Sequence, residues 1–130
     1  MPIVTVTVSE QIADRTKAGI LEEIVNITSC TLNKNEQVTV VKFIEGHSEF
    51  FNMGGMAKGI HPFDVEIKIT AGTNSKAEKA GWIESIWELM NIYFQTAEHF
   101  PCYISIIELD GDNWGFNGMT QYDRALLNQK

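Results

Sequence analysis

The segment Lys17-Ala18-Gly19-Ile20-Leu21-Glu22-Glu23-Ile24 recurs later in the chain as Lys79-Ala80-Gly81-Trp82-Ile83-Glu84-Ser85-Ile86. The two octapeptides are identical at five positions, at an offset of 62 residues. Two further stretches repeat at an offset of 63: residues 41–45 (VKFIE) match 104–108 (ISIIE), and residues 51–55 (FNMGG) match 114–118 (WGFNG). Because strand, helix, strand and glycine-rich turn recur in the same order, we expect an internal duplication with one inserted residue.

Each octapeptide lies in a predicted helix that has a predicted strand before it and another after it. β-branched residues are dense in residues 2–8 and 64–70, and further strands are expected at 37–44 and 102–109. The first helix is expected from about residue 13 to 32, with an apolar face formed by Ile20, Leu21, Ile24, Ile27 and Leu32. The second opens with a capping box, Ser75-x-x-Glu78, ends before Pro101, and has an apolar face formed by Ile83, Ile86, Trp87, Met90 and Phe94.

The two β-α-β halves predict an α/β (α+β) fold with a four-stranded sheet and both helices on one face. Strands joined through a crossover helix are parallel, and the crossover is right-handed in nearly all cases. Alternation in the first strand places Val4, Val6 and Val8 on one side and Ile3, Thr5 and Thr7 on the other. Because neither side is strongly polar, we expect other copies of the chain to cover the second face. We expect the 130 residues to form one domain of two repeats, about 2–60 and 63–120, followed by a short C-terminal tail.

Composition excludes several classes of partner. The chain has 10 basic and 17 acidic residues and a net charge of −7, with Arg15 and Arg124 as its two arginines. Nucleic acid and anionic membranes bind clustered Lys and Arg, so neither is expected as a partner. The sequence contains no apolar run of the roughly 18 residues that a membrane span needs, and its N-terminus has no secretory signal, so we expect a cytoplasmic protein.

No metal site is expected. The two cysteines lie far apart and form no C-x-x-C pair, and the three histidines fall in three different segments without the spacing of metal ligands. The sequence also contains no P-loop, no dinucleotide fingerprint and no G-x-S-x-G motif. Recognisable cofactor chemistry is therefore missing, and Pro2 remains as the candidate functional residue.

Pro2 begins the first strand of this duplicated chain, and with it the sequence resembles the tautomerase superfamily, typified by 4-oxalocrotonate tautomerase (4-OT) and macrophage migration inhibitory factor (MIF). The resemblance rests on Met1-Pro2-Ile3-Val4-Thr5-Val6, on the helix at 79–81, and on the strand 106–109 with the aromatic, glycine-rich segment 112–118. It covers nearly the whole chain, as two family units fused head to tail.

The resemblance implies that methionine is removed and that Pro2, as a secondary amine, is the general base of a tautomerase. The expected reaction is a keto-enol or 1,3-allylic proton transfer on a small 2-keto or enol acid, without metal or organic cofactor. The family arrangement also implies a homotrimer. An aromatic residue that closes the pocket maps onto Trp114, with Phe51 as its first-half copy, and Phe116 lies in the same hairpin.

Two further positions that the resemblance assigns to substrate binding map onto Asn74 and Tyr103, where the prototype carries arginine. Arginine binds a carboxylate through two parallel hydrogen bonds, which a neutral Asn or Tyr cannot reproduce. A dicarboxylate substrate is therefore disfavoured, and Lys76 and Arg15 are the candidates to replace the missing cations. Two alternatives stay open: a non-catalytic small-molecule-binding domain, in which Pro2 merely starts a strand, and a degenerate family member that keeps only the assembly. The sequence does not identify the substrate.

Overall fold

A computed structural model describes residues 1–46, 62–94 and 102–128 of the chain. The first half contains strand β1 (Ile3–Val8), helix α1 (Asp14–Leu32), the 3₁₀ turn η1 (Glu36–Val38) and strand β2 (Val40–Glu45). The second half contains strand β3 (Phe63–Thr70), helix α2 (Lys76–Phe94) and strand β4 (Tyr103–Leu109). A two-stranded hairpin, β5 (Gly115–Phe116) and β6 (Met119–Thr120), and helix α3 (Gln121–Asn128) follow.

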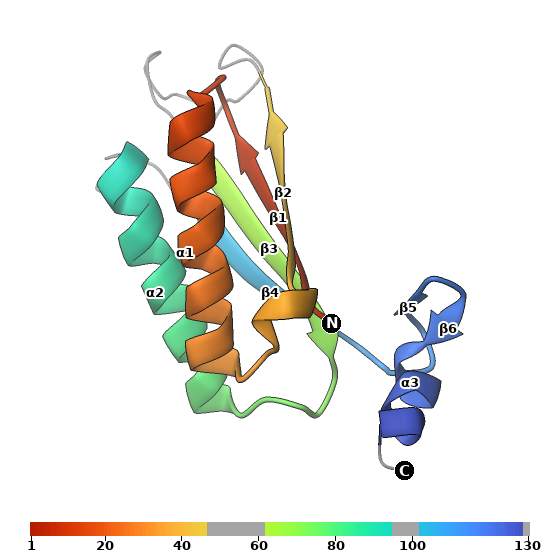
Figure 1. Ribbon diagram of the computed structural model, residues 1–130. Helices are drawn as coiled ribbons and strands as arrows, with labels where there is room; N and C mark the ends of the chain where they lie inside the picture. Colours follow the sequence, from red (N-terminus) through yellow and green to blue (C-terminus); the bar gives the residue numbers. More distant parts are fainter. Residues whose placement is uncertain (47–61, 95–101, 129–130) are drawn as a thin grey trace, which may run out of the picture.

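The four long strands form one mixed sheet in the order β2-β1-β3-β4. β1 is parallel to β2 and β3 is parallel to β4, as expected for two β-α-β units. The two units meet through the antiparallel pair β1 and β3, where Val6 lies opposite Val65. Both long helices cover the same face of the sheet, as Figure 1 shows. The fold class predicted from the sequence is confirmed.

The core lies between this sheet face and the two helices. Val4, Val6 and Val8 are fully buried, whereas Ile3, Thr5 and Thr7 are only partly buried, so the predicted alternation is confirmed. Side chains of β3 that point to the same face are also buried: Phe63, Val65, Ile67 and Ile69. The helices contribute the remaining core residues: Ile20, Ile24, Leu32, Trp82, Ile86, Leu89 and Met90.

Two details of the sequence prediction are wrong. Ile83 was expected on the buried face of α2, but its side chain is 37% exposed and Trp82 is fully buried instead. The buried positions 82, 86, 89 and 90 follow the helical period and include the expected Ile86 and Met90, so the difference is confined to Trp82 and Leu89 as added members and Ile83 as a lost one. Strand β2 begins at Val40 and not at residue 37, because the Asn35 side chain accepts a hydrogen bond from the Gln37 amide and holds a 3₁₀ turn there.

The two helices are joined at their buried face by a hydrogen bond from Trp82 Nε1 to Thr28 Oγ1, 3.0 Å long. Replacing Thr28 with Val leaves the buried indole N–H without its acceptor, which costs about 1–3 kcal/mol of unfolding free energy. Urea denaturation measures this loss. Thr31→Val is the matched control, because the Thr31 hydroxyl donates to the Ile27 carbonyl of its own helix. Equal stability of the Thr28→Val protein and the wild type would contradict this account.

Corresponding ion pairs occur in the two halves. Lys17 Nζ lies 2.7 Å from Glu45 Oε1, and Lys79 Nζ lies 2.7 Å from Glu108 Oε1. Each pair joins the first long helix of its half to the end of the parallel strand that follows, and the hydrogen bond from the lysine lowers the pKa of both carboxyl groups. These contacts support the expected duplication. The boundary between the repeats, and the end of the second helix at Pro101, lie outside the described residues.

Candidate functional site

A cavity of about 760 Å³ lies at the end of the sheet where the chain begins. The start of β1 and the end of β3 form one side of it, and the segment from Gly111 to Asn128 forms another. Figure 1 shows that β5, β6 and α3 lie beyond the sheet, at the end where the N-terminus is found. The lining includes three residues that the sequence predicted, Pro2, Trp114 and Phe116. It also includes polar residues that the sequence did not predict: Lys34, Thr70, Gln121 and Arg124.

The hairpin places Trp114 and Phe116 through a tight turn. Asn117 and Gly118 both have positive φ, 52° and 85°, as a two-residue type I′ turn requires. Gly115 cannot be replaced without movement, because a Cβ at this position would overlap the Met119 carbonyl. Trp114 Nε1 donates a hydrogen bond of 3.2 Å to Thr70 Oγ1, so the indole is attached to the end of β3.

Pro2 is buried at the start of β1. Its carbonyl accepts a hydrogen bond of 3.1 Å from the Val40 amide, which extends the pairing of β1 with β2 by one residue. The Met1 carbonyl, which is bonded to the Pro2 nitrogen, accepts a hydrogen bond of 3.4 Å from Gln121 Nε2. The carbonyls on the two sides of the Pro2 nitrogen and Cα are therefore both hydrogen-bonded, that of Pro2 to Val40 of β2 and that of Met1 to Gln121 of α3.

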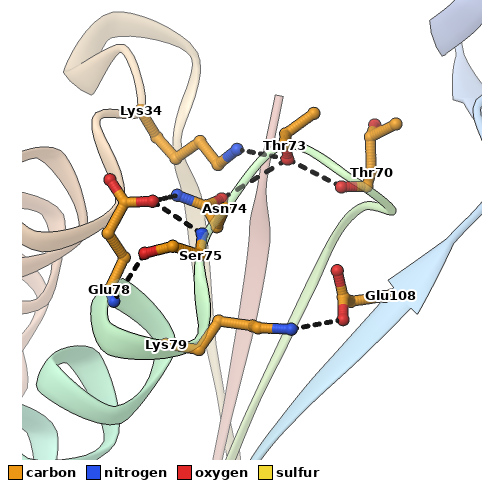
Figure 2. Close-up of polar contacts among 8 residues, drawn as sticks. All are labelled: Lys34, Thr70, Thr73, Asn74, Ser75, Glu78, Lys79 and Glu108. Atoms are coloured by element: carbon orange, nitrogen blue, oxygen red, sulfur yellow. Dashed lines mark hydrogen bonds and ion pairs between the residues drawn. The ribbon is translucent and has the colours of Figure 1, made fainter.

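Lys34 and Arg124 bring two positive charges to the cavity. Lys34 Nζ donates to Thr73 Oγ1 over 3.0 Å, as Figure 2 shows. Arg124 Nη2 donates to the Phe116 carbonyl over 2.9 Å, and its guanidinium carbon lies 3.7 Å from the centre of the Phe116 ring. Arg124 Nε is shielded from solvent and has no hydrogen-bond partner among the described residues.

The surroundings of the N-terminus shift its ionisation. Burial is the largest cause that lowers the pKa of the Met1 amine, and the charges of Lys34 and Arg124 lower it further. Burial also lowers the pKa of Lys34, against the opposing effect of Glu78. The described lining of the cavity contains no Asp or Glu. A protein with a net charge of −7 thus presents cations alone at this site.

Asn74 lies outside this cavity lining, in the network of Figure 2. Asn74 Nδ2 donates to the Leu32 carbonyl at the end of α1 over 2.8 Å, and the same nitrogen donates to Glu78 Oε1 over 3.4 Å. The predicted capping box is confirmed beside it: the Ser75 amide donates to Glu78 Oε1 over 2.7 Å, and the Glu78 amide donates to Ser75 Oγ over 3.1 Å. Asn74 therefore joins the end of α1 to the start of α2 and not to the cavity.

Tyr103 lies at the other end of the sheet from Pro2. It pairs with Asp64, which pairs with Thr7, so it is about 16 Å along the strands from the proline of its own chain. Its side chain is 70% exposed. Within one chain Tyr103 cannot join the site, and its assignment to substrate binding stays a prediction about another copy.

Two other sequence candidates, Arg15 and Lys76, do not line the described cavity. They are exposed in the first turns of α1 and α2, so they do not supply the missing cations. Phe51 and the three histidines lie outside the described residues. Within the described ranges, no cluster of His, Cys, Asp or Glu could hold a metal ion. The described helices are neither long enough nor apolar enough to cross a membrane.

Sequence comparison identifies no relative: no family model matches the chain, and no curated protein matches it. Solved structures do match in fold. A wild-type fused 4-OT, solved as an asymmetric trimer, superposes with a TM-score of 0.79 at 17% identity, over 95% of this chain and 98% of that chain.

Two further structures give the same result. A MIF-like protein from Entamoeba histolytica has a TM-score of 0.74 at 23% identity, over 92% of this chain and 97% of that one. Pt0534, inactivated by 2-oxo-3-pentynoate, has a TM-score of 0.79 at 13% identity, over 94% and 98%. At these identities the matches establish the fold alone, over nearly the whole chain.

Proposed function

We propose that this chain, which has the tautomerase-superfamily fold, is a cofactor-independent tautomerase once Met1 is removed. Pro2 is its general base, and its substrate is a small 2-keto or enol acid. One observation carries the proposal: the chain begins in a cavity whose burial and two cations lower the pKa of an amine at that place. A base is most effective when its pKa lies near the working pH.

Removal of Met1 changes the chemistry of the Pro2 nitrogen. In the full chain this nitrogen is an amide without a basic lone pair, whereas after removal it is a secondary amine. The burial of Pro2 and the same two charges, Lys34 and Arg124, then disfavour its protonated form. A larger share of the amine is therefore unprotonated and able to accept a proton at neutral pH.

The reaction requires only proton movement. The Pro2 nitrogen takes the proton from the C2 hydroxyl of a 2-hydroxydienoate, and the O–H electrons form the C2 carbonyl bond. The C2–C3 double-bond electrons then take the proton back from nitrogen, at C3 or, through the conjugated bond, at C5. The formula of the substrate is unchanged and the free amine is regenerated, so the proposed step needs no cofactor.

Lys34 and Arg124 are the groups that bind the substrate carboxylate in this proposal. They are the charged side chains of the described lining, and Arg124 Nε has no partner there. Burial strengthens their attraction for an anion. The apolar faces of Trp114 and Phe116 enclose the carbon chain, and Phe116 also supports the Arg124 guanidinium.

The pH dependence of kcat/KM reports the ionisation of the free base. Activity rises as pH passes the pKa of Pro2 and reaches a plateau above it, so the lowered pKa extends the plateau toward neutral pH. Lys34→Met removes one charge that lowers the pKa of the terminal amine. We therefore expect the rising limb of its profile to move to higher pH. A limb that stays in place, or that moves to lower pH, would contradict the proposed base.

The proposal includes a homotrimer. Fused 4-OT has been solved both as an asymmetric and as a symmetric trimer. The sheet face away from the helices has exposed apolar residues, Val40, Ile44 and Tyr103, that another copy can cover. In such an assembly Tyr103 can approach the Pro2 site of a neighbouring copy. Light scattering is expected to give about three times the 14.6 kDa mass of one chain; a monomer would exclude the shared site.

Labelling with 2-oxo-3-pentynoate, the compound that inactivates Pt0534, tests the proposal. A free Pro2 amine adds to C4 of the alkyne, the nitrogen proton moves to C3, and no atom is lost. We expect the mass of the processed protein to rise by one reagent molecule, located by fragmentation on Pro2, and turnover of a 2-hydroxydienoate to stop. Pro2→Ala serves as the comparison for turnover. Processed protein that neither reacts at Pro2 nor ketonises the dienoate would refute the function.

A non-catalytic binding domain is the second candidate, and one contact favours it. While Met1 is present, its carbonyl is hydrogen-bonded to Gln121, and Lys34 and Arg124 still line the cavity. Such a chain can bind a small carboxylate without a basic amine. Native protein of full mass, isolated from its own host in the cytoplasmic fraction, would support this candidate over the enzyme.

A further inference from the structure

The Met1 carbonyl shows how the cavity receives an oxygen atom next to Pro2. This carbonyl is bonded to the Pro2 nitrogen, and standard bond lengths place its oxygen about 2.3 Å from that nitrogen. Its oxygen accepts the hydrogen bond from Gln121 Nε2, 3.4 Å away. The first residue of the chain therefore puts a carbonyl where a substrate of the processed protein would have to lie.

Gln121 is held in this position by its backbone and its surroundings. Its amide nitrogen donates to the Trp114 carbonyl over 2.9 Å, and the next amide, that of Tyr122, donates to the Gly111 carbonyl over 3.0 Å. Thr120 caps α3 by accepting from the Asp123 amide over 3.0 Å. Gln121 is 9% exposed. Its side-chain amide thus has little access to water and is directed at the N-terminus by a fixed start of α3.

Removing Met1 takes away the oxygen that Gln121 contacts. A buried amide donor without an acceptor destabilises the protein, so the processed cavity favours a ligand that replaces this oxygen. The Trp114 indole already donates to Thr70. Lys34 donates one of its three ammonium protons to Thr73, and Arg124 Nε has no described partner, so both cations keep donors for the carboxylate.

We propose that Gln121 donates a hydrogen bond to the C2 oxygen of the substrate, and that it stabilises this oxygen as it passes between enol, enolate and ketone. The proposal rests on the function proposed above for Pro2. It assigns three parts of a 2-keto acid to three groups: the carboxylate to Lys34 and Arg124, the C2 oxygen to Gln121, and the mobile proton to Pro2.

This arrangement predicts selectivity for acids that carry oxygen at C2. A donor aimed at an oxygen that gains negative charge during the reaction acts more strongly on the transition state than on the bound substrate. Loss of one such donor typically lowers kcat by about 10²-fold. An acid of the same length without the C2 oxygen leaves the amide unsatisfied and binds more weakly.

Gln121→Leu in the processed protein tests the assignment. We expect kcat for the 2-hydroxydienoate to fall about 10²-fold, with a much smaller change in KM and an unchanged limb of the pH profile, since the charges near Pro2 stay in place. Gln121→Glu keeps the size of the side chain but places an acceptor, and a negative charge, against the enolate oxygen, so it does not restore kcat. Gln11→Leu is the matched control, because Gln11 is exposed after β1, at the far end of that strand from Pro2.

A binding measurement separates this inference from the catalytic proposal. Phenylglyoxylate is a 2-oxo acid with no proton beside its ketone, so it binds without tautomerising. We expect the side-chain amide NMR signals of Gln121 to move on removal of Met1 and to move again on addition of phenylglyoxylate. A shift without turnover supports the Gln121 contact and refutes Pro2 catalysis. The Gln121 assignment alone is overturned by a different result: turnover depends on Pro2 but is unchanged in Gln121→Leu, and the Gln121 amide signals do not shift when phenylglyoxylate is added.

Discussion

A chain with one extra glycine ahead of Pro2 is expected to lose about 10³-fold in kcat/KM for a 2-hydroxydienoate, relative to the chain that begins at Pro2. General base catalysis by a positioned group contributes about 10²- to 10⁴-fold, and acylation removes the base altogether. Both proteins can be released from a common fusion by proteolysis, so that they differ in one residue. Steady-state kinetics with equal protein concentrations measures the difference.

Thermal unfolding of the two proteins shows whether the extra residue acts on the base or on the fold. The Pro2 carbonyl bonds to the Val40 amide, and this contact does not depend on the nitrogen, so both proteins are expected to fold, and the extended chain is expected to unfold at the slightly higher temperature because Gln121 keeps its acceptor. The extended chain also supplies a carbonyl to Gln121, as Met1 does. Equal turnover by the two proteins would contradict a role for the Pro2 amine.

The double variant Lys34→Met with Arg124→Met is expected to raise KM for a 2-keto acid about 10³-fold. A hydrogen bond to a charged group contributes about 1.5–3 kcal/mol, and this variant removes the two charged side chains of the described lining. Each methionine keeps an apolar stem of similar length, so the loss of charge dominates. The binding isotherm of phenylglyoxylate, measured by isothermal titration calorimetry, gives the affinity independently of turnover.

The primary amide of the same 2-keto acid is the matched ligand for this experiment. It keeps the C2 oxygen and the carbon chain but has no negative charge, so its affinity is expected to change little in the double variant. Salt should weaken binding of the acid to the wild type more than binding of the amide. If acid and amide lose affinity equally, the two side chains act through packing, by way of the Arg124 contact with Phe116, and the carboxylate assignment is wrong.

The fold could be predicted from the sequence because its signals are local. Alternation in residues 3–8, the capping box at Ser75 and the repeated helix are set by neighbours within a few residues, and all of them appear in the structure. The error at Trp82 arose from the same local pattern. Trp82 and Ile83 are adjacent and both apolar, and the bond from Trp82 to Thr28 of the other helix is a tertiary contact that selects between them.

The site could be predicted only in part. Pro2, Trp114 and Phe116 follow from the resemblance, and all three line the cavity. Lys34 comes from the segment that follows α1, and Gln121 and Arg124 come from α3. Tertiary structure brings them to the N-terminus across as many as 120 residues. The repeat gave no signal for Gln121 and Arg124, because α3 has no counterpart in the described first half. One clue was available: Arg124, one of two arginines in the chain, lies eight residues after Phe116.

Asn74 illustrates the opposite failure. A position transferred from a family motif assumes that the same side chain faces the same space, but a shorter neutral residue can satisfy its hydrogen bonds elsewhere. In this chain Asn74 bonds to the Leu32 carbonyl, and in the proposed site the carboxylate is bound instead by Lys34, which donates to the adjacent Thr73, and by Arg124. The cavity therefore contains two cations, Lys34 and Arg124, at positions other than those that the resemblance indicates.

The central claim is that Pro2 is a free amine whose pKa is lowered by its surroundings. ¹⁵N NMR of proline-labelled, processed protein measures this directly, by following the Pro2 nitrogen as a function of pH in the folded protein and in urea. The account predicts one titrating proline nitrogen whose pKa is lower in the folded protein than in urea, and higher in Lys34→Met than in the wild type. A Pro2 nitrogen that does not titrate, or that titrates at the same pH folded and unfolded, would contradict it.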